Sequence, residues 1–187
     1  LADTLAPVSV KDPTPAQAVM VPVEDDGGLD PRRLLQRQMA ALGKMGFSPV
    51  TAVELEFYVS TASPNGEFQL KTPGGLVADP DWQQLYQFEE LDCAAPFIDD
   101  IYRIAEAQGL PVDAVLQEAG PGQFEINLKH KKDAAGAALD GLLLKRAVKN
   151  AARANGMEAT FMAKPHHDWS GSGMHIHVSL LDEAGKN

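Results

Sequence analysis

Two spacings of apolar residues run along the chain, and they predict interleaved helices and strands. Apolar residues recur at helical intervals over residues 31–45, 95–109 and about 133–155. Asp30 before Pro31 is a typical helix start, because aspartate caps free backbone N–H groups and proline is tolerated in the first turn. Alternation and short apolar runs predict strands at 18–23, 51–59, 113–118, 123–129, 158–163 and 172–181.

The connections between these elements predict hairpins and one long excursion. Asn65-Gly66 is a strong signal for a tight turn, from which the chain would return through Phe68 and Leu70. Residues 72–94 carry turn residues, aromatics and acids without a clear period, so we predict a long ordered loop there. Strands joined by hairpins and interleaved with helices predict an α+β fold, with a largely antiparallel sheet and flanking helices.

The two ends of the sequence predict a longer protein. The first residue is Leu1, and residues 182–187 form a polar turn after a predicted strand, with no return strand. We therefore expect the 187 residues to be part of a longer chain, with a fold that is incomplete at both ends.

Composition narrows the classes of function. The chain has 26 Asp and Glu against 16 Lys and Arg, a formal net charge of −10, which disfavours binding to nucleic acid or to an anionic membrane. No apolar run approaches the ~20 residues that span a bilayer. The single cysteine, Cys93, cannot form an internal disulfide and favours a reducing compartment, where we expect a small buried thiol.

Two glutamates stand on one face of a predicted strand. Glu54 and Glu56 are two residues apart, so both side chains leave the same face, while Val53, Leu55 and Phe57 lie on the opposite, packed face. Carboxylates in register repel each other unless a cation or solvent intervenes. For this pair alone, an ordinary solvated strand face is the favoured interpretation.

A second pair of glutamates flanks a tight turn. Pro121-Gly122 suits the centre of a type II turn, and a four-residue turn from Gly120 to Gln123 would place Glu118 directly opposite Glu125. Like charges opposite each other destabilise a sheet, unless a hard divalent cation such as Mg²⁺ or Mn²⁺ lies between them. A surface hairpin with two exposed acids is the alternative.

Two histidines follow a glycine-rich segment near the end of the sequence. His175 and His177 share a strand face, and the glycines at 171 and 173 allow the backbone to approach a ligand closely. Either histidine could bind metal or meet an anionic substrate, and both could equally be ordinary core or surface residues. His130 is predicted at a solvated strand end, and His166 and His167 in a loop. The sequence contains no Walker loop, dinucleotide fingerprint or serine nucleophile elbow.

Taken together, these motifs resemble the glutamine synthetase family over nearly the whole chain. The matching segments, in the order of the family, are Glu54 to Phe57, Glu118 to Glu125, Phe161 to Pro165, and Gly171 to Ser179. The resemblance implies that residues 1–28 are the end of an N-terminal β-grasp domain and 29–187 the first part of the catalytic domain. It also implies a cytoplasmic, ring-shaped homo-oligomer that joins glutamate to ammonia or another amine, using ATP and two or three Mg²⁺ or Mn²⁺ ions.

The resemblance implies a role for each site residue. Glu56, Glu118 and Glu125 match the carboxylates of a first metal site, and Glu54 and His175 match two ligands of a second, which lies against the ATP phosphates. His177 matches a histidine that contacts the transferred phosphoryl group, and Ser179 matches a residue that contacts the nucleotide. Gly171 matches a glycine that binds the substrate glutamate.

Departures from the family pattern concern the acceptor and the completeness of the site. Ser170 stands where ammonia-using members usually carry asparagine, and residues 161–165 and 169–171 look closer to the branch that makes γ-glutamyl amines and polyamines. Other elements of the family's active site lie outside these 187 residues. We therefore expect the 187 residues to be inactive alone. Two other classes stay open: a β-barrel protein in which His175, His177 and a glutamate share one metal, and a non-catalytic relative.

Overall fold

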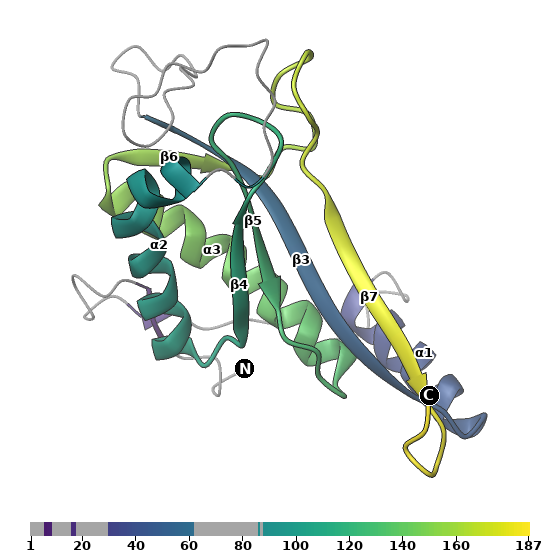
Figure 1. The fold of residues 1–187 in the computed structure, drawn as a ribbon. Coiled ribbons are helices and arrows are strands. Elements are labelled where there is room, and N and C mark those ends of the chain that lie inside the picture. Colours follow the sequence, from purple (N-terminus) through teal and green to yellow (C-terminus); the bar gives the residue numbers. More distant parts are fainter. Residues whose placement is uncertain (1–5, 9–15, 18–29, 62–85, 87) are drawn as a thin grey trace.

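The computed structural model describes residues 6–8, 16–17, 30–61, 86 and 88–187, and a five-stranded antiparallel sheet lies at its centre (Figure 1). The long strand β3 pairs with β5 along one edge. Along its other edge, β3 pairs first with β7 and then with β6, while β4 extends the sheet beyond β5. The bounds of these strands are β3 Ser48–Thr61, β4 Val112–Gln117, β5 Gln123–Leu128, β6 Met157–Thr160 and β7 Met174–Leu181.

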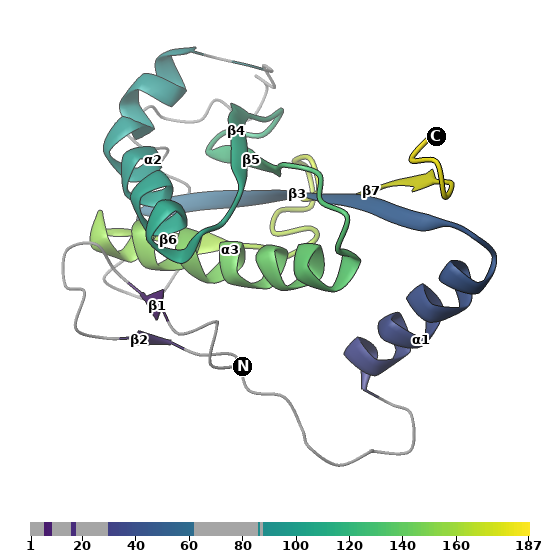
Figure 2. The same ribbon diagram turned by 90° about the horizontal axis from the view of Figure 1, so that it is seen from below.

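Three helices and a small separate sheet complete the described structure. Figures 1 and 2 show α2 and α3 side by side against one face of the sheet. Helix α1 lies on the same side of β3 as α3, near the first half of that strand (Figure 2). The bounds are α1 Pro31–Lys44, α2 Phe88–Gln108 and α3 Ala134–Ala154, and the two-stranded sheet pairs β1 Ala6–Pro7 with β2 Ala16–Gln17. The predicted α+β class with a largely antiparallel sheet is confirmed.

The hydrophobic core fills the space between the sheet and helices α2 and α3. Alternate residues of β3 point into it, as predicted: Val53 is 3% exposed, Leu55 1% and Phe57 0%. The Phe57 ring packs against the rings of Phe97 and Phe124, with centroids 6.4 and 6.2 Å away. The other set of alternate positions on β3 is therefore free to face away from the core.

Local start and stop signals define α1 as predicted. The backbone N–H of Arg32 donates to Asp30 Oδ1 at 2.9 Å, and Pro31 is the first helical residue. Gly46 ends the helix with φ at +83°, a value that only glycine adopts readily.

Three predictions about the middle of the chain need correction. The predicted loop over 72–94 is wrong for Phe88 to Ala94, which belong to α2. Glu90, Ala94 and Phe97 lie on one buried face of that helix, so its apolar spacing continues through Pro96 instead of starting there. Cys93 falls between these buried positions and is exposed. The predicted strand at 158–163 ends at Thr160.

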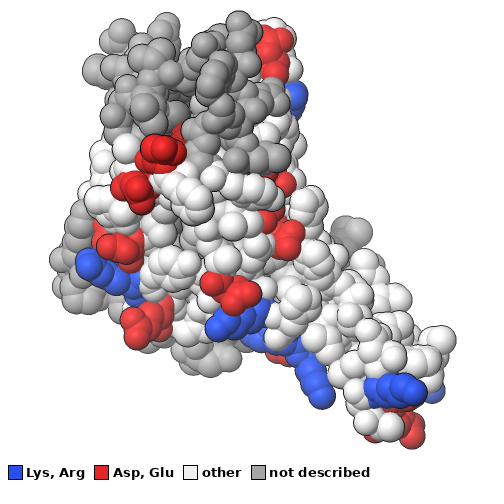
Figure 3. All heavy atoms as spheres, viewed as in Figure 1, with Lys and Arg blue, Asp and Glu red and all other residues white. Residues whose placement is uncertain are grey.

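Several predictions lie outside the described residues. These are the strand at 18–23, the Asn65-Gly66 hairpin, the loop over 72–85, and most of the predicted domain over 1–28. No helix within the described part of the chain is long and apolar enough to cross a membrane. On the face seen in Figure 3, acidic side chains are dispersed over the surface and basic ones lie mainly toward its lower part.

Replacing Phe57 tests the core. Phe57→Ala removes a fully buried ring with several aromatic contacts, and we expect it to lower the free energy of unfolding by about 3–5 kcal/mol in chemical denaturation. Phe47, which is 38% exposed just before β3, provides the control, and Phe47→Ala should cost less than about 1 kcal/mol. Equal losses in the two variants would contradict the assignment of the core.

Candidate functional site

The face of the sheet that points away from α2 and α3 gathers carboxylates and imidazoles from separate strands. Strand pairing places Glu56 of β3 opposite Glu125 of β5, and Glu54 opposite His175 of β7. His177 lies two residues further along β7 on the same face, opposite Ala52. We call this group the site face; it comprises Glu54, Glu56, Glu118, Glu125, His175 and His177.

Both histidines contact the same carboxylate. His175 Nδ1 lies 2.9 Å from Glu54 Oε2, and His177 Nε2 lies 2.8 Å from Glu54 Oε1. Burial acts to raise the pKa of Glu54, but the two histidines outweigh it and hold that pKa below its usual value. The hydrogen bond to Glu54 raises the pKa of His175 despite partial burial. Glu54 and His175, which the family resemblance assigns to the second metal site, thus contact each other directly.

The turn that carries the second pair of glutamates forms as predicted, with a different register. Gln123 N donates to Gly120 O at 2.9 Å, and Gly122 has φ at +69°, as a type II turn requires. Glu125 is paired with Leu116, however, whereas the backbone N–H of Glu118 donates to Gln123 O at 2.8 Å. The prediction that Glu118 lies directly opposite Glu125 is wrong.

The shift in register keeps both glutamates on one face. Ala119 belongs to the loop, so the ladder is displaced by two residues, and an even displacement leaves the direction of each side chain unchanged. Glu118 and Glu125 are diagonal neighbours instead of direct partners. The carboxylate directly opposite Glu125 is that of Glu56, on β3.

Burial and mutual repulsion make ionisation of two of these carboxyls costly. Burial, and then the negative charges of Glu56 and Glu125, raise the pKa of Glu118 above its usual value of 4.5. Burial, followed by the charge of Glu54, raises the pKa of Glu125. Carboxylate oxygens that are crowded and partly desolvated are suitable ligands for a hard divalent cation, whose charge would relieve both effects.

Three potential ligand groups come close together on the site face. One ligand atom each of Glu54, Glu125 and His175 lies within 4.8 Å of the others. This trio combines members of both predicted metal sites. Glu56 and Glu118 interact with this trio through their charges, because Glu56 acts to raise the pKa of Glu125, and Glu125 acts to raise that of Glu118.

Two polar residues that the sequence analysis did not single out stabilise the site face. Gln123 is 1% exposed; its Nε2 donates to Glu56 Oε2 and to Gly171 O, both at 3.0 Å, and its Oε1 accepts from Gly120 N at 2.8 Å. Tyr58, fully buried, donates to Ser170 O at 2.7 Å. Burial and the charges of neighbouring glutamates raise the pKa of Tyr58 to about 12. The two-residue spacing from Glu54 and Glu56 was the signal that could have identified Tyr58.

Helix α2 stabilises the turn from behind. Gly122 N donates to Glu90 Oε1 at 2.6 Å, and Glu90 is only 3% exposed. Burial raises the pKa of Glu90 despite this hydrogen bond. No sequence pattern indicated this contact, because it joins residues 32 positions apart whose relation depends on how α2 packs.

The glycine-rich segment lies where a side chain would collide with the site. A Cβ at Gly173 would lie 2.7 Å from Glu56 Oε1 and 3.0 Å from His175 Nε2, and one at Gly171 would lie 2.9 Å from the carbonyl oxygen of Ala163. The backbone at Gly173 therefore lies close to the side chains of the site face; the predicted approach to a ligand stays a prediction. Ser179 is opposite Val50, on the same face but further along β7 than His177.

His130 lies beside His177. It is exposed, as predicted, yet the two ring centroids are 5.9 Å apart, and an isolated bridge between Thr51 and Lys131 holds its segment against β3. His166 and His167 lie in the loop between β6 and β7, also as predicted.

Comparison with known proteins gives consistent matches. The sequence profile described as the glutamine synthetase catalytic domain matches residues 28–187. The chain is 40% identical to γ-glutamylputrescine synthetase PuuA of Escherichia coli (strain K12), over 91% of this chain and 37% of that protein. It is 32% identical to glutamate–isopropylamine ligase of a Pseudomonas species, over 84% of this chain and 34% of that protein.

The structural comparison agrees. A solved structure described as a GmaS–ADP complex superposes with a TM-score of 0.70 at 29% identity, over 84% of this chain and 35% of that one. Several proteins named glutamine synthetase are 31–34% identical to this chain. The chain thus spans roughly a third of the length of the relatives it matches.

The raised carboxyl pKa values predict a pH-dependent effect of Glu118→Gln on the metal-free protein. Folding raises the pKa of the Glu118 carboxyl above its unfolded value of 4.5. The stability that this shift contributes is fully present below pH 4.5 and is lost as the pH rises through the folded pKa. Near pH 7.5 we therefore expect the variant to unfold about 2–4 °C higher than the native protein, a shift of roughly 1 kcal/mol, kept small because Glu118 is only half-buried. Near pH 4 the difference should vanish.

The same thermal melts, repeated with Mn²⁺, test the metal. Mn²⁺ should stabilise the native protein more than Glu118→Gln, because the variant lacks one carboxylate oxygen donor. Glu106, exposed on α2, is the matched control, and Glu106→Gln should follow the native protein throughout. A Glu118→Gln protein that is less stable than native at pH 7.5 without metal would count against this interpretation.

Gly173→Ala tests the close approach at the site. The added methyl group meets the flexible ends of Glu56 and His175, so we expect them to turn aside, with little loss of stability but at least about tenfold weaker Mn²⁺ binding by calorimetry. Gly43 lies in α1, and outside the backbone of its own helix a Cβ added there would meet no atom of the described residues within 4 Å. Gly43→Ala should leave Mn²⁺ affinity unchanged; matching affinities in both variants would refute the role given to Gly173.

Proposed function

The chain belongs to the glutamine synthetase family, and on this basis we propose that the full protein is an ATP-dependent ligase that joins the γ-carboxyl group of glutamate to a primary amine. The observation that carries the proposal is the site face, where four carboxylates and two imidazoles from β3, β5, β7 and the β4–β5 turn gather on one side of the sheet. In the proposed reaction, a γ-carboxylate oxygen attacks the γ-phosphorus of ATP and ADP leaves. The amine nitrogen then attacks the acyl carbon of the resulting acyl phosphate, phosphate leaves, and the nitrogen releases a proton to give the amide.

The residues of the site face fit the divalent cations that this family uses. Glu118 and Glu125 have raised pKa values because they are buried near other carboxylates, which favours a bound cation. Glu56, Glu118 and Glu125 would hold one ion, and Glu54 and His175 a second. When bound, Mg²⁺ or Mn²⁺ supplies positive charge that neutralises the phosphates and the developing charge of phosphoryl transfer.

The remaining groups orient the reactants. We assign His177 to the transferred phosphoryl group, Ser179 to the nucleotide, and the backbone of Gly171 to the substrate glutamate. Glu54 holds both imidazoles in fixed orientations, and Gln123 connects Glu56 to Gly171 through hydrogen bonds of 3.0 Å. Phosphoryl transfer depends on positioning of this kind more than on a protein nucleophile.

A primary amine is the proposed acceptor. Two relatives named for amine substrates, putrescine and isopropylamine, are 40% and 32% identical to this chain. Ser170, in place of the asparagine usual in ammonia-using members, is adjacent to Gly171, and its carbonyl oxygen accepts from buried Tyr58. The shorter side chain changes the contacts available next to the substrate. We further propose, from family membership, a ring-shaped homo-oligomer in the cytoplasm.

The acceptor is tested with the full-length protein by glutamate-dependent release of phosphate from ATP. Ammonium, ethanolamine, isopropylamine and putrescine are supplied in turn as the sole acceptor. We expect at least one amine to equal or exceed ammonium in kcat/KM, because a pocket that hydrogen bonds a particular amine discriminates against acceptors that lack the matching groups.

The possible outcomes separate the alternatives. If kcat/KM for ammonium exceeds that for every amine by more than about tenfold, roughly 1.4 kcal/mol in transition-state binding, the amine proposal fails and ammonia is the acceptor. If none of the four acceptors supports phosphate release, the result would favour a non-catalytic relative. The His177→Asn variant, as a control, should reduce release with every acceptor.

A further inference from the structure

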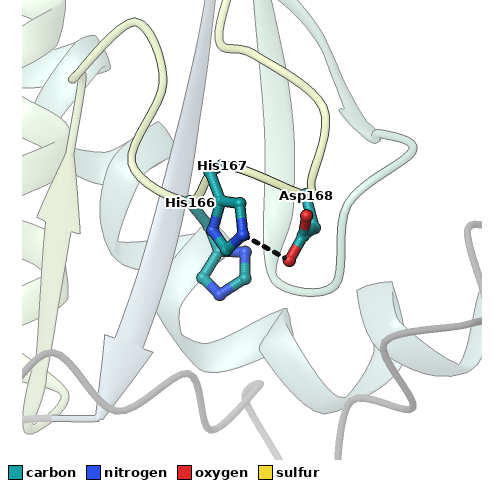
Figure 4. Close-up of side chains that lie close together, drawn as sticks. All are labelled: His166, His167 and Asp168. Carbon is teal, nitrogen blue, oxygen red and sulfur yellow. Dashed lines mark ion pairs between the residues drawn. The ribbon is translucent and has the colours of Figure 1, made fainter.

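A second cluster of potential metal ligands lies outside the site face, in the loop between β6 and β7. One ligand atom each of His166, His167 and Asp168 lies within 4.8 Å of the others (Figure 4). His167 Nε2 and Asp168 Oδ2 are already 3.0 Å apart. Ligand atoms around a tetrahedral ion with bonds of about 2.0–2.2 Å are about 3.3–3.6 Å from each other, so small side-chain rotations would complete the geometry.

The surrounding loop holds this cluster in place. The His166 ring lies against the Trp169 ring with centroids 4.6 Å apart, and Trp169 is 6% exposed. Lys164 Nζ donates to the carbonyl oxygen of Trp169, and Ser172 N donates to Ala163 O at 2.9 Å across the base of the loop. These contacts restrain the loop that carries the cluster, and so reduce the conformational entropy that would be lost on binding an ion.

One polar atom of His166 is buried without a partner. Its Nδ1 has no hydrogen-bond partner among the described residues, although buried polar atoms are nearly always paired. His167 and Asp168 have side chains that are 84% and 65% exposed, so an ion can reach them from solvent. The cluster thus combines one partly buried imidazole with two accessible ligands.

We propose that His166, His167 and Asp168 bind a divalent transition-metal ion. Two imidazoles and one carboxylate suit borderline ions such as Zn²⁺ or Co²⁺, whereas the carboxylate-rich site face favours Mg²⁺ or Mn²⁺. The bound ion also restrains the backbone toward Gly171, whose carbonyl oxygen accepts from Gln123. Binding at the loop therefore acts on a segment that ends at the site face.

Fluorescence of Trp169 reports occupancy of the loop, because this residue stacks on His166. The chain has two tryptophans, so the experiment uses the full chain with Trp82→Phe, which leaves Trp169 as the fluorophore. Co²⁺, a paramagnetic ion, should quench this fluorescence to saturation near one ion per chain, excess Zn²⁺ should reverse the quenching, and Mg²⁺ should not quench.

Variants assign the quenching to the loop. His167→Ala with Asp168→Asn should weaken Co²⁺ binding by more than about tenfold, since even the loss of outer partners of a metal site costs about 10–100-fold. Both side chains are exposed, so the circular dichroism spectrum should stay native. His175→Asn, on the site face, and His130→Ala, an exposed imidazole elsewhere, should retain the quenching.

Two results would overturn the proposal. The first is Co²⁺ quenching of equal affinity in the loop variant and the native protein, which would place the ion elsewhere. The second is the absence of saturable quenching in the native protein, which would leave His167 and Asp168 as an ordinary surface ion pair.

Discussion

Repulsion among carboxylates on one face of a sheet is the constraint around which this structure is organised. Glu56 and Glu125 are directly opposite each other on adjacent strands, and Glu118 adds a third carboxylate diagonally across the hairpin. Such an arrangement destabilises an ordinary sheet. Its persistence requires compensation from elsewhere in the fold, and a divalent cation at the proposed site would relieve the repulsion.

The compensation comes from the opposite face of the same strands. Val53, Leu55 and Phe57 alternate with the glutamates of β3 and are almost fully buried against α2 and α3. Because side chains alternate strictly along a strand, anchoring the apolar set also fixes the direction of the carboxylates. The core therefore stabilises the fold and orients the site at once.

Buried hydrogen-bonding side chains transmit this rigidity into the site. Gln123 joins the turn, the Glu56 carboxylate and the Gly171 backbone, and Glu90 holds the turn from α2. Each contact is made by a buried side chain, whose rotamer is restricted by packing. The backbone of Gly171 is thus coupled to the Glu56 carboxylate through Gln123, and the neighbouring Ser170 is held by the hydroxyl of Tyr58.

The pattern of the sequence alone determined which residues share a face. The two-residue spacings of Glu54 with Glu56 and of His175 with His177 hold for any strand, and turn chemistry at Pro121-Gly122 determined the type II turn. The N-cap of α1 at Asp30 likewise depended only on neighbouring residues. The family resemblance added roles for these residues that spacing could not supply.

The tertiary structure decided which strands are neighbours, and with it the partner of each carboxylate. Hairpin register depends on how many residues the loop takes up, so the pairing of Glu125 with Leu116 could not be derived from the turn type alone. Contacts of Glu90 with Gly122, of Tyr58 with Ser170, and of His130 with His177 join distant parts of the chain. Such contacts follow from the packing of whole elements, because local sequence fixes the direction of a side chain but not what lies opposite it.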